Sequence, residues 1–142
     1  MSWQEPALFV LLVALWWPIR GWIARRTETR FMMRNPRHAD GYILSAAPCT
    51  LRGTRPGAVL LLHGYNDSPQ SLHAVARIIH ARGWTVRVPA LTGHGRTLQE
   101  FAASGAQAWI DAARAELHAL QATHDAVAVG GLSMGGAIAL VL

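Results

Sequence analysis

Ser133 lies in a glycine-rich pentapeptide whose residue types suit nucleophilic catalysis. Residues 131–135 read Gly-Leu-Ser-Met-Gly and fit the pattern G-x-S-x-G. In a sharp strand-to-helix turn, Gly131 and Gly135 leave room for neighbouring backbone, and the turn lifts the serine hydroxyl above the edge of a sheet. The pattern therefore predicts that Ser133 is a nucleophile. The alternative is an ordinary capping serine at a glycine-rich helix start.

A serine nucleophile also needs hydrogen-bond donors for the oxyanion that forms when it attacks a carbonyl group. One donor is expected from the backbone N–H of Met134, at the start of a helix whose first N–H groups have no intrahelical partner. The second usually comes from the loop after a neighbouring strand. Here His63-Gly64-Tyr65 follows the strongest apolar run, and we expect the N–H of Tyr65 to be that donor.

The elements that must position these residues are predicted strands that alternate with predicted helices along the chain. Residues 58–63 form a continuous apolar run, which is typical of a strand buried on both faces. A second short strand is expected at 85–89 and a third buried strand at 126–130. Helical spacing is expected from Ser68, as a cap before Pro69, to Gly83, and then over residues 107–123 and 134–142. This order predicts an α/β fold, a parallel sheet with helices on both faces. Residues 25–57 look irregular, with possible short strands at 29–33 and 41–45.

Positive charge is concentrated in the first third of the chain. Residues 1–55 contain eight arginines and three acids, whereas residues 56–142 contain five of each. The expected folded module is therefore neutral, which argues against nucleic-acid binding. Cys49 is the single cysteine, so an internal disulfide is excluded.

The N-terminus combines an apolar run with flanking tryptophan and arginine. Residues 6–19 carry no charge, and Arg20 and further arginines follow. Tryptophan prefers the headgroup level of a membrane; those flanking this run are Trp3, Trp16, Trp17 and Trp22. We therefore expect a membrane-associating segment at 1–24, spanning or interfacial, a basic linker at 25–57 and a hydrolase domain at 58–142, held on the cytoplasmic side by the arginines. A buried core helix or a cleaved signal peptide is the alternative.

Three segments in order carry a resemblance to a known family. They are LLLHGYNDSP (60–69), ARGWTVRVPALTGHG (81–95) and VAVGGLSMGG (127–136). Residues 58–142 resemble the N-terminal half of an α/β-hydrolase, nearest the bacterial carboxylesterase and monoacylglycerol-lipase-like group, which is also labelled serine aminopeptidase or lysophospholipase-like. The resemblance implies ester hydrolysis, with acylglycerols or lysophospholipids as small-molecule substrates.

The resemblance also assigns roles to individual residues. It implies that Ser133 is the nucleophile and that Tyr65 supplies an oxyanion N–H. It puts the turn Gly93-His94-Gly95 beside the active-site entrance, and it gives His63 and His94 loop-holding roles. The family often has Phe-Thr-Gly where this chain has Tyr-Asn-Asp at 65–67, a change that alters the pocket wall.

The remainder of the catalytic triad is missing from this sequence. In this fold the acid and the histidine follow the serine, and residues 134–142 contain neither. We therefore expect the fold to be cut off after the serine turn and the chain alone to be inactive. A non-catalytic membrane-attached relic is the second hypothesis, and peptidase or acyltransferase chemistry the third. No histidine has a partner at metal-ligand spacing, so neither a metal nor a cofactor is expected.

Overall fold

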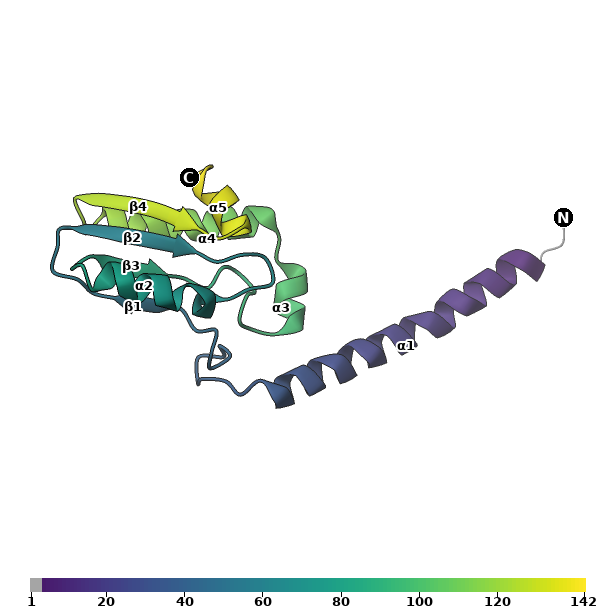
Figure 1. The fold of residues 1–142 in the computed structure, drawn as a ribbon. Coiled ribbons are helices and arrows are strands. Elements are labelled where there is room, and N and C mark those ends of the chain that lie inside the picture. The colour runs from purple at the N-terminus through teal and green to yellow at the C-terminus, as the bar shows by residue number, and fades with distance from the viewer. Residues whose placement is uncertain (1–3) are drawn as a thin grey trace. The chain divides into compact units, whose positions relative to one another are not determined.

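The protein divides into two compact units, Met1–Asn35 and Pro36–Leu142. The computed structural model describes the backbone of residues 4–142 and the side chains of residues 9–142. Figure 1 shows the first unit as a single helix, α1, and the second as a sheet with helices packed on it. Trp3 of the expected membrane segment lies outside the described residues.

Helix α1 spans Gln4–Arg34 and contains Pro18. The expectation of an irregular chain from residue 25, with a strand at 29–33, is therefore wrong for this stretch. Arginine and methionine, which are good helix formers, make up six of residues 25–34. The hydroxyl of Thr29 donates to the carbonyl of Arg25 at 2.9 Å, a bond that a threonine forms within a helix.

The apolar side chains of α1 are exposed, including Phe9, Leu12 and Trp17. Among the residues that the structure describes, no helix combines the length and the apolar character needed to cross a membrane. The expected transmembrane segment is therefore not supported.

The second unit is built on a four-stranded sheet in the order β1-β3-β2-β4. The strands are β1 (Cys49–Leu51), β2 (Gly57–Leu62), β3 (Thr85–Val88) and β4 (Ala126–Gly131). The parallel pairing predicted from sequence is confirmed, because β2 runs parallel to both β3 and β4. The sheet is nevertheless mixed, because β1 pairs antiparallel with β3.

Two strand expectations need correction. Residues 41–45 form turns with one isolated bridge, between Arg37 and Ile43, instead of a strand. Strand β4 is not buried on both faces, because it lies at the edge of the described sheet and Ala126 and Ala128 are exposed. Its valines, at 127 and 129, pack against the core on one face.

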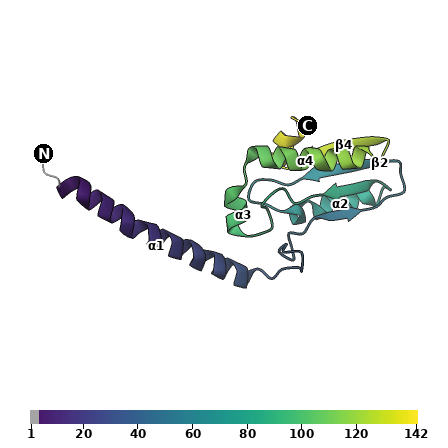
Figure 2. The same ribbon diagram turned by 180° about the vertical axis from the view of Figure 1, so that it is seen from behind.

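Helices cover both faces of the sheet, as the α/β pattern predicts. They are a 3₁₀ turn (Pro69–Leu72) leading into α2 (His73–His80), then α3 (Leu98–Ala103), α4 (Ala106–Gln121) and α5 (Met134–Ala139). In Figure 1 helix α2 lies in front of the sheet, and in Figure 2, seen from behind, α4 lies in front. Ser68 and Pro69 occupy the expected start positions, although the Ser68 side chain makes no capping bond.

The alternation of side chains along β2 divides the core into two layers. Leu60 and Leu62 face a cluster that includes Leu117 of α4 and Ile138 of α5. Leu61 faces the other side and packs in the cluster that contains Ala76 of α2. Successive residues of a strand point to opposite faces, so one apolar strand serves both cores and is held rigidly at the centre of the unit.

Candidate active site

Ser133 occupies the sharp turn between β4 and α5. Its backbone has φ 52° and ψ −116°, and residues other than glycine rarely adopt a positive φ of this kind. The turn is fixed by two bonds, from the Leu132 N–H to the Leu62 carbonyl (3.0 Å) and from the Gly135 N–H to the Leu132 carbonyl (2.9 Å). Ser133 is exposed, and its hydroxyl has no hydrogen-bond partner within the described part of the chain.

Gly131 and Gly135 are required by crowding at this turn. A Cβ on Gly131 would overlap the carbonyl group of Gly135, and a Cβ on Gly135 would overlap the carbonyl group of Leu62. Each obstacle is backbone, so a flexible side chain cannot move aside. The sequence prediction of a strand–serine–helix turn is confirmed in its geometry.

The loop after β2 is fixed by the fully buried side chain of His63. The Leu91 N–H donates to Nε2 of His63 at 3.1 Å, so Nε2 is unprotonated, and Nδ1 therefore donates its proton to the Gly64 carbonyl at 2.9 Å. One imidazole thus joins the loop after β2 to the loop after β3. Burial lowers the pKa of His63, with the Gly64 bond opposing this shift, and the ring stays neutral near pH 7.

The same loop lies next to the serine. A Cβ built on Gly64 would be 3.6 Å from the Cβ of Ser133 and 3.5 Å from the Leu132 carbonyl oxygen. No described hydrogen bond uses the N–H of Tyr65. The N–H of Met134 belongs to the first turn of α5, where helical N–H groups have no intrahelical acceptor. The residues that sequence reasoning grouped into one site, Ser133, Met134 and 63–65, are therefore neighbours.

The turn Gly93-His94-Gly95 packs behind this loop. Gly93 and Gly95 have φ of 78° and 70°, and a Cβ on Gly95 would be 2.9 Å from the backbone oxygen of Ala46. His94 is 2% exposed, and its Nδ1 lies 3.3 Å from the Thr92 carbonyl oxygen. Burial lowers the pKa of His94, which favours the neutral ring. These contacts agree with a loop-holding role.

An aromatic cluster borders the site. The Tyr65 ring centroid is 5.4 Å from that of Phe101 and 5.7 Å from that of Trp109. His94 packs edge-on against the same two rings, at 4.9 and 5.4 Å, and against His63 at 4.7 Å. Rings at these separations and tilts attract each other. Tyr65, which follows Gly64 in the loop next to Ser133, remains exposed, so one aromatic ring of the cluster faces solvent.

Asp67 orders the end of the loop. Its carboxylate accepts hydrogen bonds from the Ser68 N–H and the Ser71 hydroxyl, each at 2.7 Å. Burial raises the pKa of Asp67, but the bonds from Ser71, Ser68 and Gly64 together outweigh burial and lower it. The carboxylate therefore stays ionised at neutral pH, fixed to its own loop.

Comparison with known proteins agrees with this geometry. The model of the family described as serine aminopeptidase S33 matches residues 53–142. The chain belongs to the serine aminopeptidase S33 family. It is 31% identical over 100 residues to a thermostable monoacylglycerol lipase of Bacillus sp. (strain H-257) and 30% identical over 101 residues to a carboxylesterase of Bacillus subtilis (strain 168).

A solved structure shares the fold of this S33 protein. It comes from work on two metagenome-derived lipolytic enzymes, LipS and LipT, and matches with a TM-score of 0.66 and 39% identity over 70% of the present chain. The α/β-hydrolase fold predicted from sequence is confirmed. The chain spans about 40% of the length of that structure and of the two Bacillus relatives.

Sequence reasoning missed the aromatic residues that pack against Tyr65 and the helix α3 that carries one of them. It did not group Phe101 and Trp109 with Tyr65, because they come from separate helices. It also missed α3, although Thr97 and Glu100 are spaced as a capping box: the Glu100 N–H donates to the Thr97 hydroxyl, and the Thr97 N–H to Glu100, each at 3.0 Å. That spacing could have located the helix, but its contact with Tyr65 depends on tertiary packing.

Proposed function

We propose that this protein is a serine hydrolase that cleaves carboxylic esters through an acyl-enzyme on Ser133. The observation that carries the proposal is the position of Ser133, which is exposed, has a positive φ and lies in the turn between Gly131 and Gly135, next to Gly64. In the reaction the Ser133 oxygen attacks the ester carbonyl carbon and the alkoxide leaves with a proton. Water then releases the acid and restores the serine.

The backbone N–H groups of Tyr65 and Met134 are assigned as the oxyanion donors. Both amides border Ser133, and neither has a protein acceptor among the described bonds. Two such donors stabilise the tetrahedral intermediate more than the ground state, and losing one typically costs a factor of about 10²–10³ in rate. The neutral His63 supports this arrangement by holding the Gly64 carbonyl away from the developing charge.

The reaction also requires a base for the serine proton. In the described part of the chain no histidine is hydrogen-bonded to Ser133, and the side chains of His63 and His94 bond to loop residues instead. The proposal therefore assigns the nucleophile and the oxyanion donors to these residues and gives neither histidine the role of base. Peptidase chemistry, which the family description names, and a non-catalytic relic are the competing functions.

The aromatic cluster favours esters with an apolar acyl group. Tyr65 is exposed in the loop next to Ser133 and packs against Phe101 and Trp109, so it offers apolar surface near the nucleophile. The relatives are named a monoacylglycerol lipase and a carboxylesterase, so we propose acylglycerols or lysophospholipids as the substrate class.

A fluorophosphonate probe tests the proposal in the protein as its gene encodes it. We expect labelling of Ser133 and its loss in Ser133→Ala, with Ser45→Ala, at an exposed serine outside the site, as the control that keeps labelling. Turnover of p-nitrophenyl esters above aminoacyl p-nitroanilides supports the esterase. The reverse preference supports the peptidase, and absence of labelling supports the relic. Labelling that survives in Ser133→Ala identifies another nucleophile and overturns the assignment.

A further inference from the structure

The C-terminal half of α1 concentrates positive charge and tryptophan. Residues 20–34 contain five arginines and one acid, Glu28, which gives a formal net charge of +4. Trp22 lies within this half of the helix, and Trp16 and Trp17 lie about one turn before it. All three side chains are exposed. The residues assigned above to the candidate active site all belong to the second unit, so these side chains have no role in that assignment.

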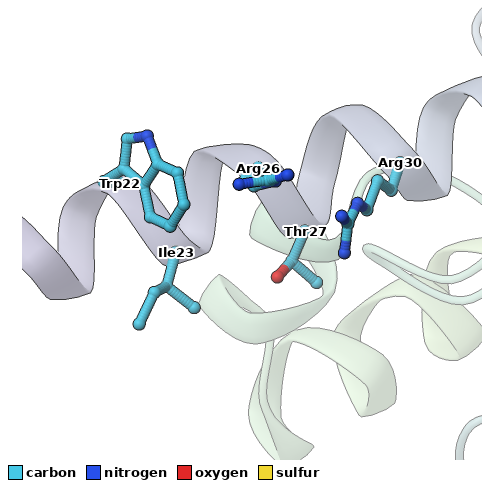
Figure 3. Close-up of a pocket in the computed structure, with 5 residues that line it drawn as sticks. All are labelled: Trp22, Ile23, Arg26, Thr27 and Arg30. Carbon is cyan, nitrogen blue, oxygen red and sulfur yellow. The ribbon is translucent and has the colours of Figure 1, made fainter.

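One hollow on α1 combines the groups that bind a phosphate. It has a volume of about 310 Å³ and is lined by Trp22, Ile23, Arg26, Thr27 and Arg30. Figure 3 shows these side chains on successive turns of the helix. The Arg26 guanidinium carbon lies 4.9 Å from the centre of the Trp22 ring.

The chemistry of this hollow suits an anionic lipid headgroup. Arg26 and Arg30 are four residues apart and therefore neighbours on one helix face. Guanidinium groups match phosphate oxygens with paired N–H donors. The Trp22 ring adds an apolar body with one N–H, the combination that places tryptophan at the boundary between headgroups and acyl chains.

Arginines also surround the helix. Arg25 and Arg34 are nine residues apart, which at about 100° per residue puts them on opposite sides of α1. A second hollow, lined by Trp17, Arg20, Gly21 and Ala24, has a volume of about 230 Å³. A folded protein partner covers one side of a helix, whereas lipid headgroups can contact all sides. The distribution of charge therefore favours a membrane surface.

The apolar turns before these arginines complete the pattern. From Phe9 to Ile19 the helix has no charged side chain and its apolar side chains are exposed. At about 1.5 Å per residue this part is about 15 Å long, roughly the depth of one leaflet of a ~30 Å hydrocarbon core. Apolar and basic residues are thus separated along the helix axis, as the depth profile of a bilayer requires.

We propose that α1 binds the surface of a bilayer that contains anionic phospholipid. Arg26 and Arg30 hold a headgroup phosphate, Trp22 lies at the headgroup level, and Phe9–Ile19 reach the acyl chains. This proposal is independent of the chemistry at Ser133, because it rests on α1 alone.

Vesicle co-sedimentation of the full chain tests the proposal. The vesicles are phosphatidylcholine alone or phosphatidylcholine mixed with an equal part of phosphatidylglycerol. We expect tighter binding to the anionic vesicles and weaker binding as salt is added. In Arg26→Gln/Arg30→Gln binding should fall about 30-fold, since each arginine near an anionic surface contributes a factor of about five.

The matched control is Arg52→Gln/Arg82→Gln, which removes the same charge from two exposed arginines of the second unit. Its binding should stay within about two-fold of wild type, since both side chains lie outside the helix that meets the surface. Equal losses in the two double variants would reduce the effect to net charge and overturn the site. Equal binding to both vesicle types would exclude headgroup recognition. Binding to labelled duplex DNA but to neither vesicle would assign α1 to nucleic acid instead.

Discussion

The two units of this protein contain similar apolar residues but use them differently. In α1 the leucines and tryptophans are exposed along a helix that is basic toward its C-terminal end, whereas in residues 36–142 the leucines of β2 are buried between helices on both faces. An apolar residue stabilises a fold only where tertiary contacts remove it from water. The comparison shows that composition alone does not separate a core from a binding surface.

The largest expected difference between the units concerns leucine truncation. Leu60→Ala should lower the free energy of unfolding by about 2–5 kcal/mol, because Leu60 is fully buried and its loss leaves a cavity. Leu12→Ala in α1 should change it by less than about 0.5 kcal/mol, because that side chain is 56% exposed. Urea unfolding of the full chain measures both. Similar losses in the two variants would mean that α1 also contributes a core.

Glycine substitution should give effects of opposite sign in the two units. Gly135→Ala should destabilise the second unit by about 3 kcal/mol or more, because the new Cβ meets the backbone of Leu62. Gly21→Ala should stabilise helix α1 by about 0.5–1 kcal/mol, because the nearest atom to its new Cβ is the flexible end of Arg25 at 3.8 Å. Urea midpoints and far-ultraviolet circular dichroism report the two effects. A harmless Gly135→Ala would contradict the close approach of α5 to β2.

A smaller difference is expected in the response to acid. Burial lowers the pKa of His63 and His94 from the ordinary value of 6.5, so the unfolded chain binds more protons than the folded one as pH falls below that value. Stability of the second unit should therefore be complete above about pH 6.5 and decline between there and the folded-state pKa. The lowered pKa of Asp67 adds a loss in the same direction at lower pH. Residues 4–34 contain no histidine, so α1 should keep its helix content.

Unfolding curves at about pH 7.5 and about pH 5.5, on either side of the ordinary histidine pKa, measure this response. In His63→Asn the decline should be shallower, whereas in His118→Asn, which removes an exposed histidine of α4, it should match wild type. A pH response identical in all three proteins would show that His63 does not carry it.

Much of the second unit could be predicted from residue pattern. The strands expected at 58–63 and 85–89 become β2 and β3 almost to the residue, and the helix expected at 107–123 is α4. Fully buried parallel strands leave a continuous apolar signature that few other structures share. The possible strands at 29–33 and 41–45 were wrong, because a short run of mixed polar and apolar residues does not distinguish a strand from a helix or a turn.

The candidate site likewise has one part that the sequence predicts and another part that depends on tertiary packing. The sequence by itself determined the serine turn, because only glycine fits at residues 131 and 135 and the motif lies directly between an apolar strand and a helix. It also determined the polarity of α1 along its axis, which is a property of residue order. Tertiary structure decided how closely Gly64 approaches Ser133, which two loops His63 joins, and that Tyr65 meets Phe101. Such contacts join residues many positions apart, and their distances depend on how the sheet aligns its strand ends, which no local pattern encodes.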